Sequence, residues 1–138
     1  MSIHPTAIVD DGATVSDGVT LGPYAVIGAG VTLASGVSVG HHASITGPTT
    51  IGRDTTVFPY AAIGGDAQEK KYAGEVGFLT IGERNVFREY TTVNRGTRSG
   101  YTTIGDDNLF MAYSHVAHDA TIGNHCAFVN SANIAGHV

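Results

Sequence analysis

The sequence has a single cysteine, Cys126, no tryptophan and only 14% charged residues among 138 positions. One cysteine excludes a disulfide within the chain, which is typical of cytoplasmic proteins. No apolar run is long enough to span a bilayer and no signal peptide is recognisable, so we expect a cytoplasmic chain without membrane insertion. The net charge of −5 argues against nucleic-acid binding. It still permits an acidic ligand, because a local basic loop can override the total charge.

The most regular feature of the chain is an apolar residue at every sixth position. A period of six fits neither a helix nor an ordinary two-faced strand, and it is typical of hexapeptide parallel β-helices. Three hexads make one coil, so residues one coil apart are expected to stack at about 4.8 Å. We therefore predict an all-β parallel β-helix of about seven coils. The twenty lead positions, none of them polar, are Ile3, Val9, Val15, Leu21, Ile27, Leu33, Val39, Ile45, Ile51, Val57, Ile63, Ile81, Phe87, Val93, Ile104, Phe110, Val116, Ile122, Phe128 and Ile134.

Two further positions of the hexad follow a pattern. The residue four places after the lead is mostly small, as at Ala25, Val37 and Cys126, which suits the narrow interior of a coil. We therefore interpret Cys126 as a packed core thiol rather than a catalytic one. Glycine often follows the lead directly, as at Gly22 and Gly52, and we expect these glycines to provide positive φ at tight corners.

The repeat is interrupted twice. Continuing its register through the first break would bury Glu69 and Glu75 at lead positions, so residues about 65–79 are expected to leave the coil as a loop. Five extra residues near 98–102 predict a second, smaller loop. Long loops on a rigid scaffold tend to carry function. Residues 1–138 are predicted to form a single repeat domain, truncated at its C-terminus because the last hexad is incomplete.

Four of the seven histidines fall in the last 24 residues. Winding at three hexads per coil places His118 beside Gly136, with Asp119 and His137 next to them. The hexad one coil earlier adds the residues that follow Val93. The neighbourhood gathered in this way comprises Asn94, Arg95, His115, His118, Asp119, Gly136 and His137.

This cluster has the parts of an acyl-transfer site. A neutral His118 can take a proton from a hydroxyl, and Asp119 can orient its ring. Gly136 lets a backbone N–H approach a developing oxyanion. No serine or cysteine nucleophile is paired with the histidine, so direct transfer without a covalent enzyme intermediate is the simpler chemistry.

The competing interpretation of clustered histidines is a zinc site, which commonly uses three protein ligands. His115 and His118 are three residues apart across a corner and can approach one another. The trimeric hexapeptide-repeat carbonic anhydrases resemble this chain in fold and bind metal with histidines from two subunits. No arrangement of carboxylate and histidine here clearly copies theirs, so we expect no metal.

Four local motifs, in the same order, resemble those of the UDP-N-acetylglucosamine acyltransferases. The resemblance covers the whole chain but only about the first half of a family member. The motifs are QEKKYAGE at 68–75, NRGT at 94–97, SHVAHDATIGN at 114–124 and AGHV at 135–138.

The resemblance implies a left-handed β-helix and a homotrimer with active sites between subunits. It implies transfer of an (R)-3-hydroxyacyl chain from acyl carrier protein to the 3-hydroxyl of UDP-N-acetylglucosamine, the first step of lipid A synthesis, without a cofactor. By this resemblance His118 is the general base, Asp119 its partner and Gly136 the oxyanion donor. The residues implied to contact the UDP-sugar or shape its pocket are Gln68, Glu69, Lys71, Asn94, His115 and His137.

Departures from the family pattern leave alternatives open. Asn94 stands where histidine is common, Glu69 replaces aspartate and Lys70 replaces leucine, so the acceptor is either UDP-N-acetylglucosamine or an amino-sugar analogue. A related lipid A N-acyltransferase is a second candidate, although it carries an extra N-terminal domain and lacks the Gln-x-x-Lys-Tyr loop. A third is a catalytically incompetent trimeric scaffold. The last coil is open, and the resemblance implies that the family uses a later segment for acyl-chain length selection, uridine contacts and carrier-protein docking.

Overall fold

The computed structural model describes all residues, 1–138, and contains strands but no helix. No segment is therefore a helix long and apolar enough to cross a membrane. The strands are only two to four residues long, because the chain turns a corner soon after each lead residue. They are β1 (Ser2–Ile3), β2 (Ile8–Val9), β3 (Thr14–Val15), β4 (Thr20–Leu21), β5 (Val26–Ile27), β6 (Val31–Leu33), β7 (Ser38–Val39), β8 (Ser44–Ile45), β9 (Thr49–Ile51), β10 (Thr56–Val57), β11 (Ala62–Gly65), β12 (Phe78–Ile81), β13 (Val86–Phe87), β14 (Thr92–Asn94), β15 (Tyr101–Ile104), β16 (Leu109–Phe110), β17 (His115–Val116), β18 (Thr121–Ile122), β19 (Ala127–Phe128) and β20 (Asn133–Ile134).

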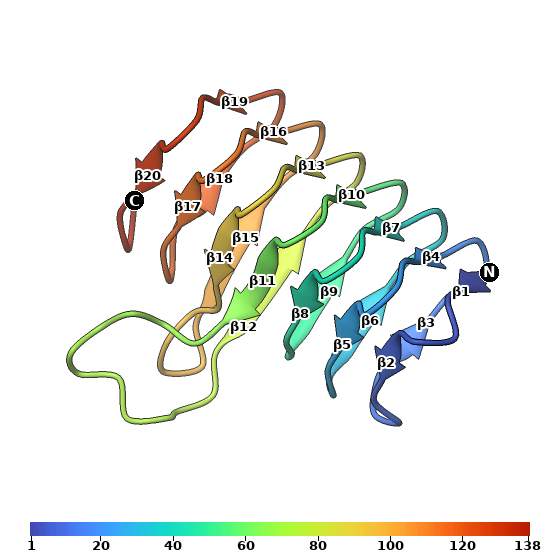
Figure 1. The fold of residues 1–138 in the computed structure, drawn as a ribbon. Helices are drawn as coiled ribbons and strands as arrows, with labels where there is room; N and C mark the ends of the chain where they lie inside the picture. The colour runs from blue at the N-terminus through green and yellow to red at the C-terminus, as the bar shows by residue number, and fades with distance from the viewer.

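Each strand pairs in parallel with the strand one coil away, and the coils rise in steps from one end of the molecule to the other (Figure 1). The first sheet has the order β1-β4-β7-β10-β13-β16-β19, and the second has β2-β5-β8-β11-β14-β17-β20. The third runs β18-β15-β12-β9-β6-β3. Ser2 pairs with Thr20 and Val116 with Ile134, so the predicted coil of three hexads is confirmed.

The lead residues form the core of the coil. Phe87 and Phe110 are fully buried, and the rings of Phe87, Phe110 and Phe128 stack with centroids 4.8 and 4.9 Å apart. Exposure rises at the ends of the stack, where Ile3 is 41% exposed. Cys126 is partly buried and packs against this core, in the position expected from the sequence.

The predicted positive φ of the glycines after the lead residues is confirmed at Gly64, where φ is 85°, but it is wrong for the others. Gly22 and Gly52 do not have positive φ, which falls two residues later, as at Tyr24 with φ of 59°. These glycines are needed because neighbouring coils approach closely. A Cβ on Gly22 would lie 2.9 Å from the backbone nitrogen of His41, and one on Gly52 would lie 2.6 Å from a backbone carbon of Gly82.

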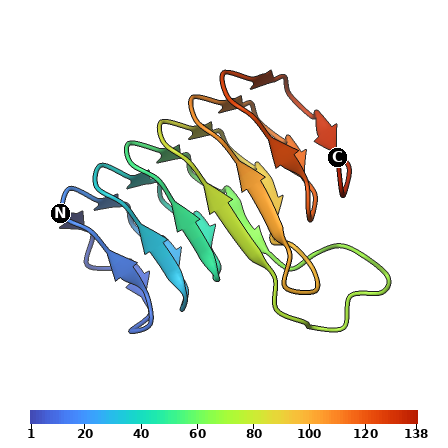
Figure 2. The same ribbon diagram turned by 180° about the vertical axis from the view of Figure 1, so that it is seen from behind.

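Both interruptions leave the coil at the corner between the second and third sheets, and their loops lie side by side there (Figures 1 and 2). The first loop covers residues 66–77 and the second 95–100, so the predicted boundaries need correction. Leu79 and Thr102 lie in strands because both side chains are buried at the inward position two residues before a lead, where they pair. Gly65 also ends a strand.

Candidate active site

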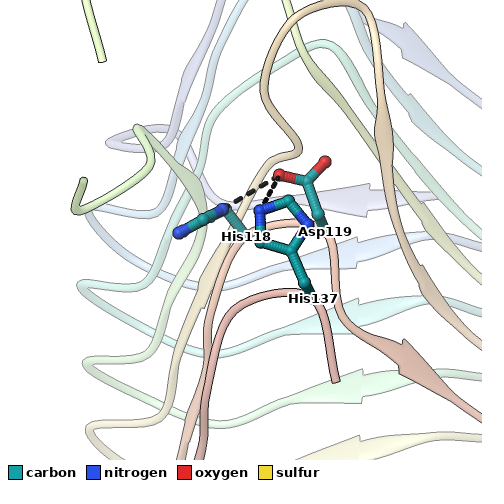
Figure 3. A group of neighbouring side chains, drawn as sticks. All are labelled: His118, Asp119 and His137. Carbon is teal, nitrogen blue, oxygen red and sulfur yellow. Dashed lines mark hydrogen bonds and ion pairs between the residues drawn. The ribbon is translucent and has the colours of Figure 1, made fainter. Parts of the chain in front are cut away.

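The candidate site forms where the corners of two successive coils stack. Strands β17 and β20 pair in register, so the residues at the two following corners meet. His118 lies beside Gly136, as the coil period predicted. Asp119 lies beside His137 (Figure 3). The backbone N–H of His137 donates to the carbonyl of His118 at 3.1 Å, which holds the two corners together.

His118 is buried and held by Asp119. Its Nδ1–H donates to Asp119 Oδ2 at 2.9 Å, and Asp119 also accepts hydrogen bonds from the hydroxyl of Thr97 at 2.7 Å and its backbone N–H at 3.1 Å. Burial works to raise the pKa of Asp119, but the hydrogen bonds from Thr97 and His118 outweigh it and hold the pKa below its usual value. Asp119 is therefore a carboxylate that only accepts, which keeps the proton of neutral His118 on Nδ1 and leaves Nε2 free as a base.

The free Nε2 of His118 faces the backbone of Gly136. A Cβ on Gly136 would lie 2.7 Å from Nε2 and 2.8 Å from Cε1, so any side chain there would collide with the ring. The N–H of Gly136 donates no hydrogen bond within the chain. It is therefore available to an oxyanion that forms close to the base.

The other two predicted histidines, His115 and His137, belong to the same two coils. His137 is 63% exposed in its side chain, and its Nε2 lies 3.8 Å from Asp119 Oδ2. The rings of His118 and His137 meet nearly at right angles, with centroids 5.0 Å apart. His115 Nδ1 forms a hydrogen bond of 2.6 Å with the hydroxyl of Thr92. Burial lowers the pKa of His115 and outweighs the opposing effect of Thr92, with a smaller lowering from His118.

Acidification is expected to destabilise the protein partly through His115. Its pKa is lower in the folded state than its ordinary value of 6.5, so the unfolded chain binds more protons between these two values. Stability therefore rises with pH through this window and falls as pH drops below 6.5. Between pH about 7.5 and about 5.5, we expect Tm to fall less in His115→Gln than in the parent. The exposed His4→Gln serves as the control, and an unchanged pH dependence in His115→Gln would contradict this prediction.

The first loop brings one of its predicted residues to the histidine. Glu69 Oε2 lies 3.8 Å from His118 Nδ1, and this oxygen is buried and accepts no hydrogen bond. Gln68 and Lys71 are exposed on the same loop and make no hydrogen bond or ion pair with His118. Asn94 is buried at the end of β14, where its Oδ1 is also without a partner.

The same cluster could also hold a metal ion. His118, Asp119 and His137 each offer a ligand atom, and these atoms lie within 4.8 Å of one another. Such donors suit zinc. However, His118 Nδ1 already pairs with Asp119 Oδ2, and a cation held between these two atoms would have to displace that hydrogen bond. The geometry favours a base–carboxylate pair over a metal centre.

Sequence reasoning missed the residues that position Asp119. Thr97 holds its carboxylate, and Thr102 accepts a hydrogen bond of 2.8 Å from its backbone N–H. Thr97 was visible in the NRGT motif, but no spacing rule connects the second loop to the corner one coil later. The ion pair between Arg98 and Glu69, with nitrogen and oxygen 3.3 Å apart, joins the two loops and was also missed.

Known proteins resemble this chain throughout its length. The family of bacterial transferase hexapeptides (six repeats) matches residues 101–136. The acyl-[acyl-carrier-protein]–UDP-N-acetylglucosamine O-acyltransferase of Alkalilimnicola ehrlichii is 62% identical over 138 residues, and that of Stenotrophomonas maltophilia is 55% identical. The matches cover 99% of this chain but 54% and 52% of the two relatives. The chain thus spans about half the length of the curated relatives it matches.

Solved structures agree with the sequence matches. A crystal structure of a UDP-N-acetylglucosamine acyltransferase has a TM-score of 0.97 at 45% identity, covering 99% of this chain and 54% of that one. The Campylobacter jejuni UDP-N-acetylglucosamine acyltransferase has a TM-score of 0.93 at 37% identity, with coverage of 99% and 54%. The expected left-handed parallel β-helix of hexapeptide repeats is confirmed.

Proposed function

We propose that this chain, which is homologous over 99% of its length to about half of the UDP-N-acetylglucosamine acyltransferases that it matches, carries the catalytic base of that O-acyl transfer. The reaction moves an (R)-3-hydroxyacyl group from acyl carrier protein to the 3-hydroxyl of UDP-N-acetylglucosamine, the first step of lipid A synthesis. One observation carries the proposal. His118 presents a free Nε2 beside the unbonded N–H of Gly136, while Asp119 holds its other nitrogen.

The proposed step replaces a thioester bond by an ester bond. His118 Nε2 takes the proton of the sugar hydroxyl as its oxygen attacks the thioester carbonyl carbon. Negative charge moves to the carbonyl oxygen, where the N–H of Gly136 stabilises it. The C–S bond then breaks, and the leaving thiolate takes the proton back from His118. Asp119 stabilises the imidazolium between the two transfers, so the enzyme ends in its starting state.

The remaining predicted residues are assigned to the acceptor. Lys71 is an exposed cation on the first loop and suits the diphosphate of a UDP-sugar. Glu69, close to His118, and Gln68 beside it on the chain are assigned to the sugar. Buried Asn94, with its free amide oxygen, also suits a polar acceptor. His137, next to the base, and His115, which precedes it on the same coil, are assigned to the walls of the same pocket.

A homotrimer would complete this pocket. His118 lies at a corner whose outer side, including His137, is open to solvent, and a single chain encloses no cavity there. Acyl transfer requires that water be kept from the thioester. A second copy of the chain packed along this corner would close the site, which supports an active site between subunits.

Replacing Gly136 by alanine is expected to lower kcat/KM for acyl transfer by about tenfold or more, because the new methyl group displaces the base. The backbone φ of Gly136 is not positive, so the change adds little strain to the coil. Steady-state kinetics and thermal denaturation test this. Gly123→Ala is the matched control, because a Cβ there would meet nothing within 4 Å. Full activity in Gly136→Ala would contradict the close approach of ring and backbone.

The function itself is tested by incubating the protein with UDP-N-acetylglucosamine and (R)-3-hydroxyacyl carrier proteins of several chain lengths. We expect an O-acylated sugar nucleotide by mass spectrometry, and none from an acceptor that lacks the 3-hydroxyl. Activity is expected to survive a chelator. No product from a folded trimer would support the scaffold alternative and overturn the proposal.

Two other outcomes identify the remaining alternatives. An amide formed on a sugar nucleotide with a free 2-amino group, with no ester formed from UDP-N-acetylglucosamine, would indicate N-acyl transfer. An amide formed only on an analogue with an amino group in place of the 3-hydroxyl would indicate the amino-sugar acceptor. Loss of activity with the chelator and its return with zinc would indicate a metal centre at His118, Asp119 and His137.

A further inference from the structure

We infer that Arg98 is a positioning residue. Its ion pair with Glu69 connects the second loop to the first and holds the Glu69 carboxylate beside His118. This inference rests on the proposed function. The guanidinium Nη2 of Arg98 lies 3.3 Å from Glu69 Oε1, and the other carboxylate oxygen, Oε2, lies 3.8 Å from His118 Nδ1. One end of the carboxylate is therefore held by the arginine while the other faces the base.

The two loops are joined by a second ion pair of the same kind. Arg95 Nη2 lies 2.6 Å from Asp66 Oδ1, and Arg95 Nη1 donates to the carbonyl of Gly64. The two arginines, Arg95 and Arg98, are three positions apart in the second loop. Their acidic partners, Asp66 and Glu69, are also three positions apart in the first loop. The buried Arg95 fixes the root of the first loop, and Arg98 reaches the part that approaches the base.

Backbone contacts fix the far end of the first loop but not Glu69. Ser99 N–H donates to the carbonyl of Val76 at 2.7 Å, and Phe78 N–H donates to that of Gly100 at 2.9 Å. The backbone of Glu69 only accepts a bond within its own loop, from Tyr72 N–H at 3.0 Å. The position of the Glu69 side chain relative to His118 therefore depends on Arg98.

This arrangement matters to the reaction more than to the fold. The Arg98 side chain is 56% exposed, and exposed ion pairs contribute little to global stability. The Glu69 carboxylate, in contrast, has a buried oxygen without a hydrogen bond. Held near His118, this negative charge favours the imidazolium that forms during transfer, and its free oxygen can accept a hydrogen bond from the sugar.

The test compares R98A, R98K, E69Q and the double variant R98A/E69Q with the parent. The control is R53A, which removes an arginine of similar exposure that pairs with Glu83 at 3.2 Å. We expect R98A to lower kcat/KM about threefold to tenfold with little change in Tm, and R98K to retain most activity. The double variant is expected to match E69Q, because Arg98 acts through Glu69. Independent, multiplying effects of the two changes would overturn the inference, as would an R98A variant as active as the parent.

A second measurement does not depend on activity. Lys70 and Lys71 are exposed in the first loop, so the rate of tryptic cleavage after them reports how firmly the loop is held. We expect faster cleavage in R98A and E69Q but not in R53A. If the parent transfers no acyl group, the proposed function is overturned. If the rate of tryptic cleavage is also unchanged in R98A, this inference is overturned as well. An active parent with unchanged kcat/KM in R98A overturns this inference alone.

Discussion

Substitution of His118 by alanine is expected to lower kcat/KM for acyl transfer by about 10²–10⁴-fold, the usual contribution of a positioned general base. No other group replaces it. His137 is the nearest imidazole, but its Nε2 lies toward Asp119, 3.8 Å away. The fold is expected to persist, because His118 lies at a corner outside the apolar core.

Steady-state kinetics measured beside thermal denaturation separate the two effects. His125→Ala is the matched control, because its side chain is 79% exposed and it lies at the corner after the next strand. We expect the control to keep parent activity. A folded His118→Ala protein with parent kcat/KM would contradict the assignment of the base.

Substitution of Phe110 by alanine is expected to destabilise the protein by about 3–5 kcal/mol, the usual cost of emptying a buried aromatic position. Phe110 is fully buried and stacks between Phe87 and Phe128. Its loss removes both ring contacts and leaves a void that rigid neighbouring coils fill poorly.

Chemical denaturation followed by circular dichroism measures this change. Tyr113→Ala is the matched control, because Tyr113 follows the same strand, stacks on Tyr90 and is 61% exposed. We expect it to cost about 1 kcal/mol or less. Equal losses in the two variants would mean that Phe110 does not lie inside the coil.

The fold was predictable because neighbours in a solenoid are fixed by counting. Once the period is six and three hexads close a coil, the pairing of Val116 with Ile134 follows, and so does the approach of His118 to Gly136. The same counting failed at the loops. Leu79 and Thr102 read as loop residues, although their inward positions continue the core into the strands that restart the coil.

Polar contacts inside the coil were less accessible from sequence. Asn85 and Asn108 occupy the inward position that was expected to be small and mostly apolar. The amide of Asn85 donates to the carbonyl of Gly105 at 2.7 Å, and that of Asn108 to the carbonyl of Gly123 at 2.9 Å. A period identifies which positions face inward, but it does not show at which of them a polar side chain can form a hydrogen bond with the backbone of the next coil.

The residues of the candidate site were predicted from the sequence, but the contacts that hold them in place were not. The motifs and the winding together identified His118, Asp119 and Gly136. The hydroxyl of Thr97 that holds Asp119, and the pairing of Arg98 with Glu69, depend on loop conformations that no repeat encodes. The conformation of a loop that leaves a periodic scaffold is determined by its contacts with neighbouring loops, and the repeat does not encode these contacts.

Catalysis by His118 requires that Asp119 hold its proton on Nδ1 and leave Nε2 free as the base. Long-range ¹H–¹⁵N correlation spectra of histidine-labelled protein report which ring nitrogen carries the proton, with His118→Ala identifying the resonance. The predicted result is a neutral His118 ring with the proton on Nδ1, and a loss of this preference in Asp119→Asn. A neutral ring protonated on Nε2 would contradict the role of His118 as the base, because the nitrogen facing Gly136 would then be a donor.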